Sequence, residues 1–288
     1  MSMMNSRLKL REQTDFCDPV GPSFASAKKW KTRIEGTEIE FRAPKHRPMV
    51  KSKKGATPEP SYRYDNINFR SIYNKKLHVA NDWDEATLFY HNWAFNGPWF
   101  SGCLADLTLT FTLLKKRHSN PAVSFFHPRA FEQTIAEYLT NLFSKQKTQG
   151  KHKFIAPIKW QPVSGLPVFA VRFQSESDTS IGLYFKTEYL IFPLEDQHLA
   201  VFTFYPSRHA SGSIEEINKQ IGEGNINKLI NDIIDSIHVT LSAEAKLQQS
   251  RALEGLEAPS LTNSFPPLDW SGSKTSDTQA SLTDNASR

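Results

Sequence analysis

Two cysteines and nine histidines are the side chains in this sequence that could supply a nucleophile, a general base or a metal ligand. They are scattered: no two cysteines have C-x-x-C spacing, and no two histidines have H-x-x-x-H spacing. Cys103 follows Ser101 and Gly102, a run that lacks the G-x-S-x-G pattern of a nucleophile elbow. A pair of Cys103 with a histidine would depend on tertiary structure. The sequence therefore predicts no catalytic residue, no metal site and no cofactor.

Glycine-rich phosphate-binding patterns are also missing. Neither G-x-x-x-x-G-K-[ST] nor G-x-G-x-x-G occurs in the chain. The run GEGN at 222–225 has two glycines, but it follows a predicted helix, whereas phosphate loops follow strands. We interpret this run as a break between two helices.

An aromatic cluster surrounds the turn at 96–98. If exposed, such a cluster would be an interaction hot spot for a protein partner. The alternative is a corner of the hydrophobic core. The candidate partner-binding residues are Trp93, Phe95, Trp99 and Phe100.

Basic residues are concentrated near the N-terminus, where residues 1–80 hold 17 Lys and Arg against 8 Asp and Glu. The remaining chain holds 18 against 22. This asymmetry is compatible with an anionic partner or with a solvated loop. Tyrosines at 62, 64 and 73 follow the basic run, so single-stranded nucleic acid is a possible ligand. The candidate anion contacts are Arg42, Lys45, Arg47, Lys51, Lys53 and Lys54.

Alternating apolar and polar residues predict an antiparallel sheet that would position these groups. The clearest strand is 104–116, with leucines and a phenylalanine on one face and Asp106 and three threonines on the other. Further strands are predicted at 37–42, 85–93, 154–163, 166–174, 181–194, 198–206 and 237–241. Helical spacing of apolar residues predicts helices after Pro128 and over 226–237, and Ser213 with Glu216 has capping-box spacing. The predicted fold class is α+β, with helices packed on an antiparallel sheet.

The predicted domain organisation has three parts. Residues 1–30 are expected to be a flexible lead-in, and residues 31–241 a single domain with a basic loop insertion at about 45–80. Residues 242–288 are Ser/Thr-rich and poor in core-forming residues, which predicts disorder. Phe265 and Trp270 within this tail are either a short docking segment or chance hydrophobic residues.

Targeting signals are not evident. The N-terminal run has no apolar stretch of the length that a secretory signal needs, and no run approaches the roughly 20 apolar residues of a membrane helix. Two cysteines make no disulfide framework. We therefore expect a cytoplasmic protein without a membrane span.

Three apolar motifs resemble those of Mog1/PsbP-like domains. IEFRAP resembles their first strand, VSGLPVFAVRF their central hairpin, and HLAVFTFYP followed by KLINDIIDSIHV their closing strand and helix. The resemblance spans about 35–241 and implies a compact α/β/α sandwich without catalytic residues. Members of that family include a nuclear-transport GTPase regulator, photosystem extrinsic subunits and adaptor chaperones of toxin secretion. No functional residue carries over, because the match concerns the scaffold alone.

Three functions are consistent with these features. The leading hypothesis is a non-catalytic adaptor or chaperone that binds another protein through the sheet face or the aromatic corner. The first alternative is a nucleic-acid-binding protein that uses the basic N-terminal region. The second alternative is an enzyme without a recognisable motif, which a deep pocket lined by titratable groups would favour. The oligomeric state is not predicted.

Overall fold

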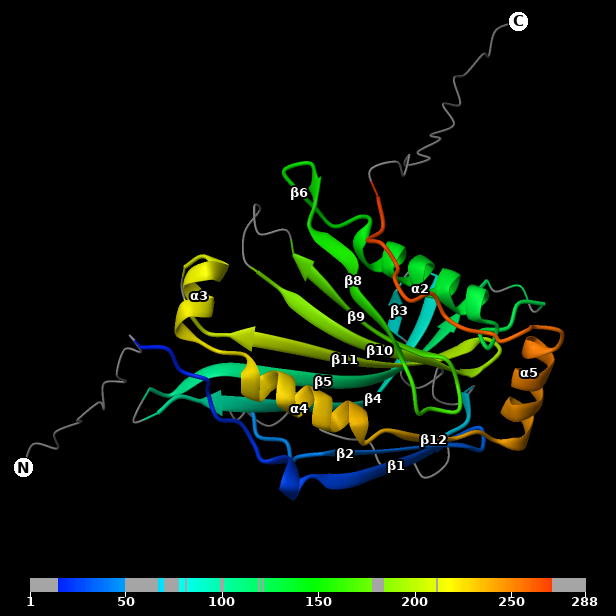
Figure 1. Ribbon diagram of the computed structural model, residues 1–288, viewed down its shortest axis with the longest axis horizontal. Coiled ribbons are helices and arrows are strands. Elements are labelled where there is room, and N and C mark those ends of the chain that lie inside the picture. Colours follow the sequence, from blue (N-terminus) through cyan, green and yellow to red (C-terminus); the bar gives the residue numbers. More distant parts are fainter. Residues whose placement is uncertain are drawn as a thin grey trace, which may run out of the picture.

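The computed structural model describes residues 15–49, 67–69, 78–80, 82–98, 101–118, 120, 122–177, 184–210 and 212–270, with the backbone alone at 78–80. In these residues the helices and strands form three layers, with one large sheet in the middle (Figure 1).

The middle layer is a seven-stranded sheet with the order β3-β4-β5-β11-β10-β9-β8. Every neighbouring pair in it is antiparallel. The strands are β3 (His78–Ala80), β4 (Trp83–Asn96), β5 (Cys103–Lys116), β8 (Phe154–Val163), β9 (Ala170–Ser177), β10 (Lys186–Glu195) and β11 (His198–Arg208). The expectation of an antiparallel sheet is thus confirmed, as is the edge position of β8, which contains two prolines.

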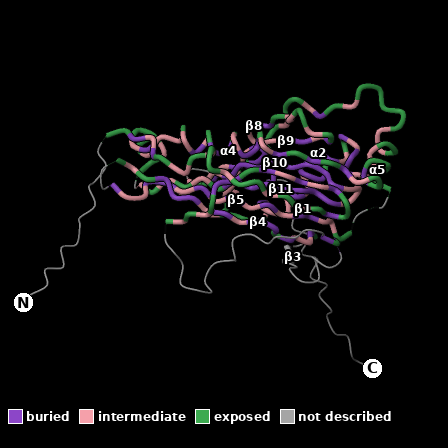
Figure 2. The backbone as a smooth tube through the Cα atoms, turned by 90° about the horizontal axis from the view of Figure 1, so that it is seen from below, coloured by how far each residue is buried: buried purple, intermediate pink, exposed green. Residues whose placement is uncertain are grey.

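The alternation in β5 and β11 decides which side chains each face receives. Leu107, Leu109 and Phe111 of β5 are buried on one face, as the sequence predicts. β11 lies between β5 and β10, and its residues 198–204 are buried, because both faces of the sheet are covered there. The tube view shows the same pattern, with burial concentrated in the middle of the sheet (Figure 2).

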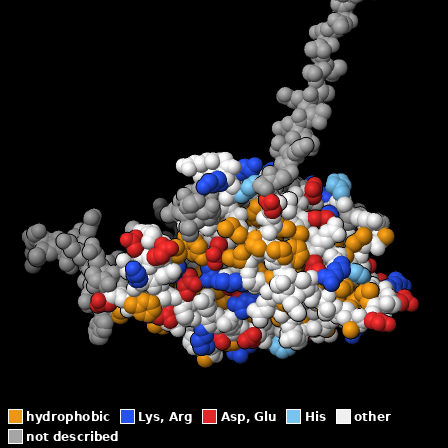
Figure 3. Space-filling view, turned by 45° about the horizontal axis from the view of Figure 1, so that its top comes forward, with side chains coloured by type: hydrophobic (Ala, Val, Ile, Leu, Met, Phe, Trp, Pro, Cys, Tyr) orange, Lys and Arg blue, Asp and Glu red, His pale blue; other side chains and the backbone are white. Residues whose placement is uncertain are grey.

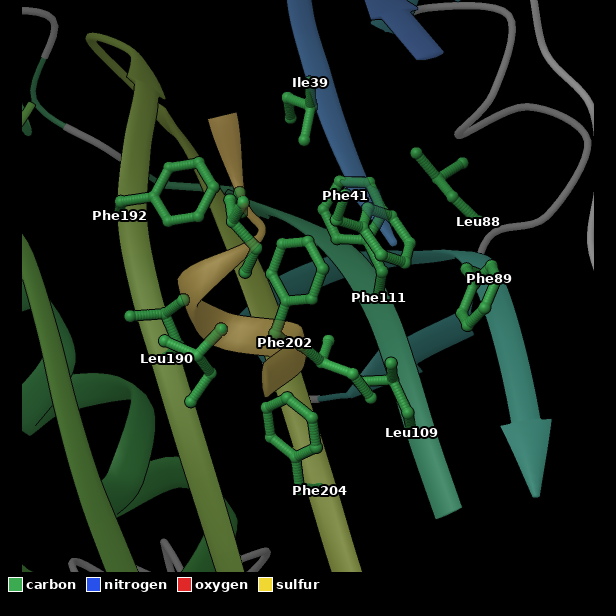
Figure 4. Packing of buried hydrophobic residues seen from close by; sticks show 14 of the residues in the cluster. Ile39, Phe41, Leu88, Phe89, Leu109, Phe111, Leu190, Phe192, Phe202 and Phe204 are labelled. Carbon is green, nitrogen blue, oxygen red and sulfur yellow. The ribbon is translucent and has the colours of Figure 1, made fainter. Parts of the chain in front are cut away.

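One outer layer combines a small sheet with a helix. The small sheet has the order β1-β2-β12, with strands β1 (Lys28–Ile34), β2 (Thr37–Ala43) and β12 (His238–Thr240), and the helix beside it is α4 (Gly224–Asp235). Phe41 of β2 reaches the main sheet, where its ring centroid lies 5.1 Å from that of Phe202, and Phe202 stacks on Phe111 at 4.6 Å (Figure 4). Burial of each such ring stabilises the fold by about 1.5–3 kcal/mol.

The other outer layer is α2 (Pro128–Phe143), which starts at Pro128 as predicted. A proline suits the first helical turn, because its missing N–H has no partner there in any helix. Phe131, Ile135 and Leu139 on one side of α2 pack on the second face of the main sheet. α2 and the α4 layer therefore cover opposite faces of the sheet.

The remaining elements lie around these layers. They are η1 (Phe24–Ser26), the hairpin β6 (Lys147–Thr148) and β7 (Lys151–His152), α3 (Ile214–Gln220) and α5 (Ala243–Leu253). The predicted helix break at 222–225 is confirmed, since α3 ends at Gln220 and α4 begins at Gly224. Within the described ranges, each helix is too short or too polar to span a bilayer.

The flexible lead-in predicted for 1–30 is wrong for residues 15–30. The backbone of Cys17 donates to Gln220 at 2.9 Å and accepts from Gly222 at 2.8 Å, and Val20 exchanges two backbone hydrogen bonds with Asn96. Asn96 is about 80 positions from Val20, and Gln220 and Gly222 are about 200 positions from Cys17. A local sequence pattern therefore does not predict these contacts. Residues 1–14 lie outside the described residues.

The disordered tail predicted for 242–288 is wrong for residues 242–270. Ser242 caps α5 by accepting a hydrogen bond from Ala245, and the chain then continues to Trp270, which is 5% exposed. A few widely spaced apolar residues are enough to hold this segment, because it packs on existing elements and does not build a core of its own. Residues 271–288 lie outside the described residues.

The basic insertion predicted at about 45–80 is described in part. Arg47 exchanges backbone hydrogen bonds with Asn92 and Ala94 of β4, and Ile67 exchanges them with Arg33 and Glu35. Both short stretches therefore lie against strands, and residues 50–66 and 70–77 lie outside the described residues.

Candidate functional site

The face of the main sheet that carries α2 is only partly covered. Leu114 and Val201 lie in the apolar cluster with α2. Side chains alternate between the two faces along a strand, so every second residue of β5 and β11 lies on this face. Further along both strands from Leu114 and Val201, these residues are polar. These positions are Thr112, Thr110, Thr108 and Asp106 on β5, and Tyr205 and Ser207 on β11. Figure 3 shows hydrophobic side chains gathered in the middle of this side of the molecule, with charged side chains around them.

A cavity of about 760 Å³ lies where this polar face meets α3. Its floor comes from the ends of β5, β10 and β11, and one wall is α3. We call this cavity the α3 groove. Its volume is within the range of ligand-binding clefts.

The helix that forms the wall has an unusual environment. α3 has no buried residue, yet Ile214 and Ile217 line the groove. The aromatic side chains Phe185 and Tyr205 also line it, and they remain 46% and 44% exposed. The predicted capping box is present: Ser213 accepts from the Glu216 N–H and Glu216 accepts from the Ser213 N–H at 2.7 Å. The helix is therefore stabilised locally rather than by packing on a core.

An ion network lies at the end of the groove next to α4. Glu223 accepts a hydrogen bond from Lys186 at 2.7 Å and forms an ion pair with Arg208 at 3.1 Å. The two cationic side chains are only 9% and 7% exposed. Arg208 also donates to the Asn218 amide oxygen at 2.6 Å, which ties α3 to β11. Burial alone would raise the pKa of Glu223, but the two cations outweigh it and hold the pKa below its ordinary value.

Asp106, which lines the groove, forms a histidine–carboxylate pair with His209. His209 Nε2 donates to Asp106 Oδ2 at 2.8 Å, and Asn92 donates to Oδ1 at 3.0 Å. The hydrogen bond to Asp106 raises the pKa of His209 above its ordinary value. Such a pair can move a proton, but acyl or phosphoryl transfer also needs an activated nucleophile. Burial raises the pKa of the nearby Cys103 thiol, which keeps it protonated and unreactive at neutral pH.

The partner-contact hypothesis is wrong for Trp93 and Phe95, and the alternative, a corner of the hydrophobic core, is confirmed for these two residues. Trp93 is 0% and Phe95 is 1% exposed, because β4 turns both toward the small-sheet layer. Trp93 Nε1 donates to the Lys45 carbonyl at 3.1 Å, which satisfies its polar atom inside the core. Side chains without accessible surface cannot contact a partner. Trp99 and Phe100 lie outside the described residues.

Three of the candidate anion contacts, Arg42, Lys45 and Arg47, are exposed. The Arg42 guanidinium lies 5.2 Å from the centroid of the Phe24 ring and donates to the Ala27 carbonyl at 3.3 Å. It is thus engaged within the fold. Lys51, Lys53 and Lys54 lie outside the described residues, so their role stays a prediction.

The neighbouring basic strand β1 is balanced by acidic side chains of β2. Lys29 lies 2.5 Å from Glu40, and Lys31 lies 2.6 Å from Glu38, with Arg33 3.3 Å from the same carboxylate. A surface with alternating charges of both signs is not a continuous track for a phosphate backbone. The described part of the basic region therefore favours the interpretation of solvated strands and loops.

The patterns in the sequence do not predict the α3 groove. Its most visible signals are Asp106, the carboxylate on the polar face of β5, and the capping box of α3. The pairing of His209 with Asp106 and of Glu223 with two cations joins distant segments, which no spacing reveals. Comparisons of the chain with protein-family models, with curated proteins and with solved structures give no match. The site is therefore interpreted from its own geometry.

Proposed function

We propose that this protein is a non-catalytic adaptor or chaperone that binds another protein through the α3 groove. The observation that carries the proposal is the pair of isoleucines on α3, Ile214 and Ile217, which line the same cavity as the exposed rings of Phe185 and Tyr205. Apolar walls around an unfilled space are stabilised when apolar groups of a partner enter and exclude water.

The residue types in the groove favour a protein partner. Tyrosine and arginine are enriched at the energetic centres of protein interfaces, and the groove contains Tyr184, Tyr205 and Arg208. Charged groups of both signs line the groove, namely Asp106 and Glu223 with the cations Lys186 and Arg208, and they can fix the orientation of a bound segment. The resemblance to Mog1/PsbP-like domains, which include regulators, subunits and adaptor chaperones, supports the same function.

A photo-crosslinking experiment tests the proposal. A benzophenone amino acid at position 217 on α3 is compared with the same probe at position 247 on α5, where Leu247 is 45% exposed. In extracts of the source cells, the probe at 217 is expected to capture a protein that the probe at 247 does not capture. The variant Ile217→Glu should abolish the complex without lowering the unfolding midpoint, because α3 contributes no buried residue.

Three outcomes would contradict the proposal. Equal capture at both positions would show that contacts at α3 are nonspecific. A nuclease-sensitive crosslink would favour the nucleic-acid-binding alternative. A small molecule that co-purifies with the wild-type protein, and is lost in Ile217→Glu, would favour a ligand-binding or catalytic role for the groove.

A further inference from the structure

A second surface, distant from the α3 groove in sequence, is occupied by the chain itself. After α5, residues 254–270 run without helix or strand along α2 and β8 (Figure 1). Leu261 and Trp270 of this segment are 7% and 5% exposed and belong to the same apolar cluster as α2 and β8. We call residues 259–270 the C-terminal strap and the surface beneath it the α2–β8 groove.

Side chains of α2 and β8 form hydrogen bonds with the backbone of the strap. The Thr262 N–H donates to Glu132 of α2, and the Thr262 carbonyl accepts from Trp160 Nε1 of β8 at 2.8 Å. Arg129 donates to Glu132 at 2.9 Å, which keeps this buried carboxylate in place. Hydrogen bonds to a backbone N–H and carbonyl do not depend on the bound residue, so this arrangement accepts extended chains in general.

The half-buried residues of the strap recur every three positions, and its two buried residues, Leu261 and Trp270, lie outside this repeat. Pro259, Thr262, Phe265 and Leu268 are half-buried, and apart from Leu261 and Trp270 the residues between them are exposed. A repeat of three is the period of the polyproline II helix, and Pro266 and Pro267 favour that conformation.

Aromatic rings form the side-chain part of the groove. The Trp160 ring lies 4.9 Å from Phe265, and Phe143 lies 6.0 Å from Trp270. Trp270 Nε1 donates to Thr140 of α2 at 3.3 Å, and the Leu268 N–H donates to the Ala156 carbonyl of β8 at 2.8 Å. In other domains, aromatic-lined grooves recognise extended segments that contain proline. Here the rings of the groove contact Phe265 and Trp270, and Pro266 and Pro267 are exposed.

We propose that the α2–β8 groove is a binding site for proline-containing extended segments of a partner protein, and that the C-terminal strap is its intramolecular competitor. The strap defines the chemistry of the partner segment: a leucine, then aromatic residues four and nine positions later, with two prolines between them. The strap is attached to the groove through the short connection after α5, so it competes at an effective concentration of about 1 mM. If the strap itself binds the empty groove with a Kd of about 10 μM, a partner segment would bind the wild-type chain about 100-fold more weakly than the empty groove.

The test uses the full-length chain and a fluorescent peptide with the sequence of residues 257–270. In the double variant Phe265→Ala/Trp270→Ala, which weakens the strap and leaves the groove unchanged, the peptide should bind at least tenfold more tightly than to the wild type. A peptide that carries the same two alanines should not bind. Adding Trp160→Phe, which replaces the indole by a smaller aromatic ring and removes its N–H, should weaken peptide binding about tenfold.

Failure of the peptide to bind a double variant that unfolds cooperatively would overturn the proposal. Equal binding of a scrambled peptide would overturn it as well. A concentration-dependent dimer of the wild-type chain, in which the straps are exchanged between copies, would identify a second copy as the occupant instead of a partner protein.

A measurement on the unmodified chain covers the case in which the double variant does not fold. With excess peptide, hydrogen exchange at the Thr262 and Leu268 amides of the strap should accelerate at least tenfold, because the peptide displaces the strap. Amides of β5 serve as the internal control and should not change. Unchanged exchange at Thr262 and Leu268 at millimolar peptide would overturn the proposal.

Discussion

His91 Nδ1 lies 3.0 Å from the carbonyl oxygen of Pro44, and both groups are buried. A carbonyl oxygen can only accept, so Nδ1 carries the proton of the neutral ring. Burial, with a smaller contribution from His46, lowers the pKa of His91 to about 4. The strand β4 and the loop that follows β2 are thus joined by a histidine that stays neutral in the folded state.

We predict that His91 makes the fold sensitive to acid. An unfolded histidine binds a proton near pH 6.5 and the folded His91 only near pH 4, so the unfolded state binds more protons between these values. Titration of His91 should therefore lower the free energy of unfolding by up to about 3 kcal/mol as the pH falls from 7 to 4, and this contribution of His91 levels off at lower pH.

Urea denaturation at pH 7.5 and 4.5 measures this effect. The variant His91→Gln, which keeps a donor for Pro44, should lose less stability on acidification than the wild type does. His118→Gln, at an exposed turn, is the matched control and should behave as the wild type. Equal losses in wild type and His91→Gln would show that other groups, such as His46, cause the acid sensitivity.

The carboxylate of Glu223 is expected to be essential for stability. Glu223→Gln leaves the nearly buried Lys186 and Arg208 without their carboxylate, which should destabilise the fold by about 3 kcal/mol. Asp232→Asn on α4, the helix that begins just after Glu223, breaks the exposed pair with Lys228 and should cost less than about 0.5 kcal/mol. Thermal and urea denaturation of both variants distinguish the two cases, and similar losses would contradict the assignment of a structural role to the buried network.

The strap should contribute to global stability. Trp270→Ala removes a ring from the cluster shared with α2 and should destabilise the protein by about 3 kcal/mol. Leu256→Ala, at a side chain that is 37% exposed in the same segment, should change stability by less than about 0.5 kcal/mol. An unchanged unfolding midpoint for Trp270→Ala in urea would mean that the strap is not docked in solution.

Removal of the two N-cap serine hydroxyls should have different effects, one on local hydrogen exchange and the other on global stability. Ser213→Ala should accelerate hydrogen exchange in α3 and leave the thermal midpoint unchanged, since α3 buries no residue. Ser242→Ala at the start of α5 should cost about 1 kcal/mol globally, because it removes the acceptor for the Ala245 N–H, and α5 places the buried Ala245 against the core. A global loss on Ser213→Ala would show that α3 packs more firmly than its exposure indicates.

Part of the α3 groove could have been anticipated from the sequence. The alternation of residues 104–116 puts Asp106 on the polar face of β5, and Ser213 with Glu216 marks the start of α3. Its other components could not be anticipated. Glu223 lies in the helix break that the sequence predicts, but its contact with Lys186 depends on the packing of α4 beside β10.

The sequence by itself determined the elements whose patterns are local: the faces of β5, the first turn of α2 and the apolar stripe of α4. These follow from backbone geometry, because side chains alternate along a strand and recur every three to four residues along a helix. Only the tertiary structure decided that Trp93 and Phe95 are buried and that Trp270 packs on α2. The same is true of the backbone hydrogen bonds that Cys17 forms with Gln220 and Gly222. Whether an aromatic side chain lies on a contact surface or in the core depends on which distant segment covers it. The neighbouring residues in the chain do not predict that segment.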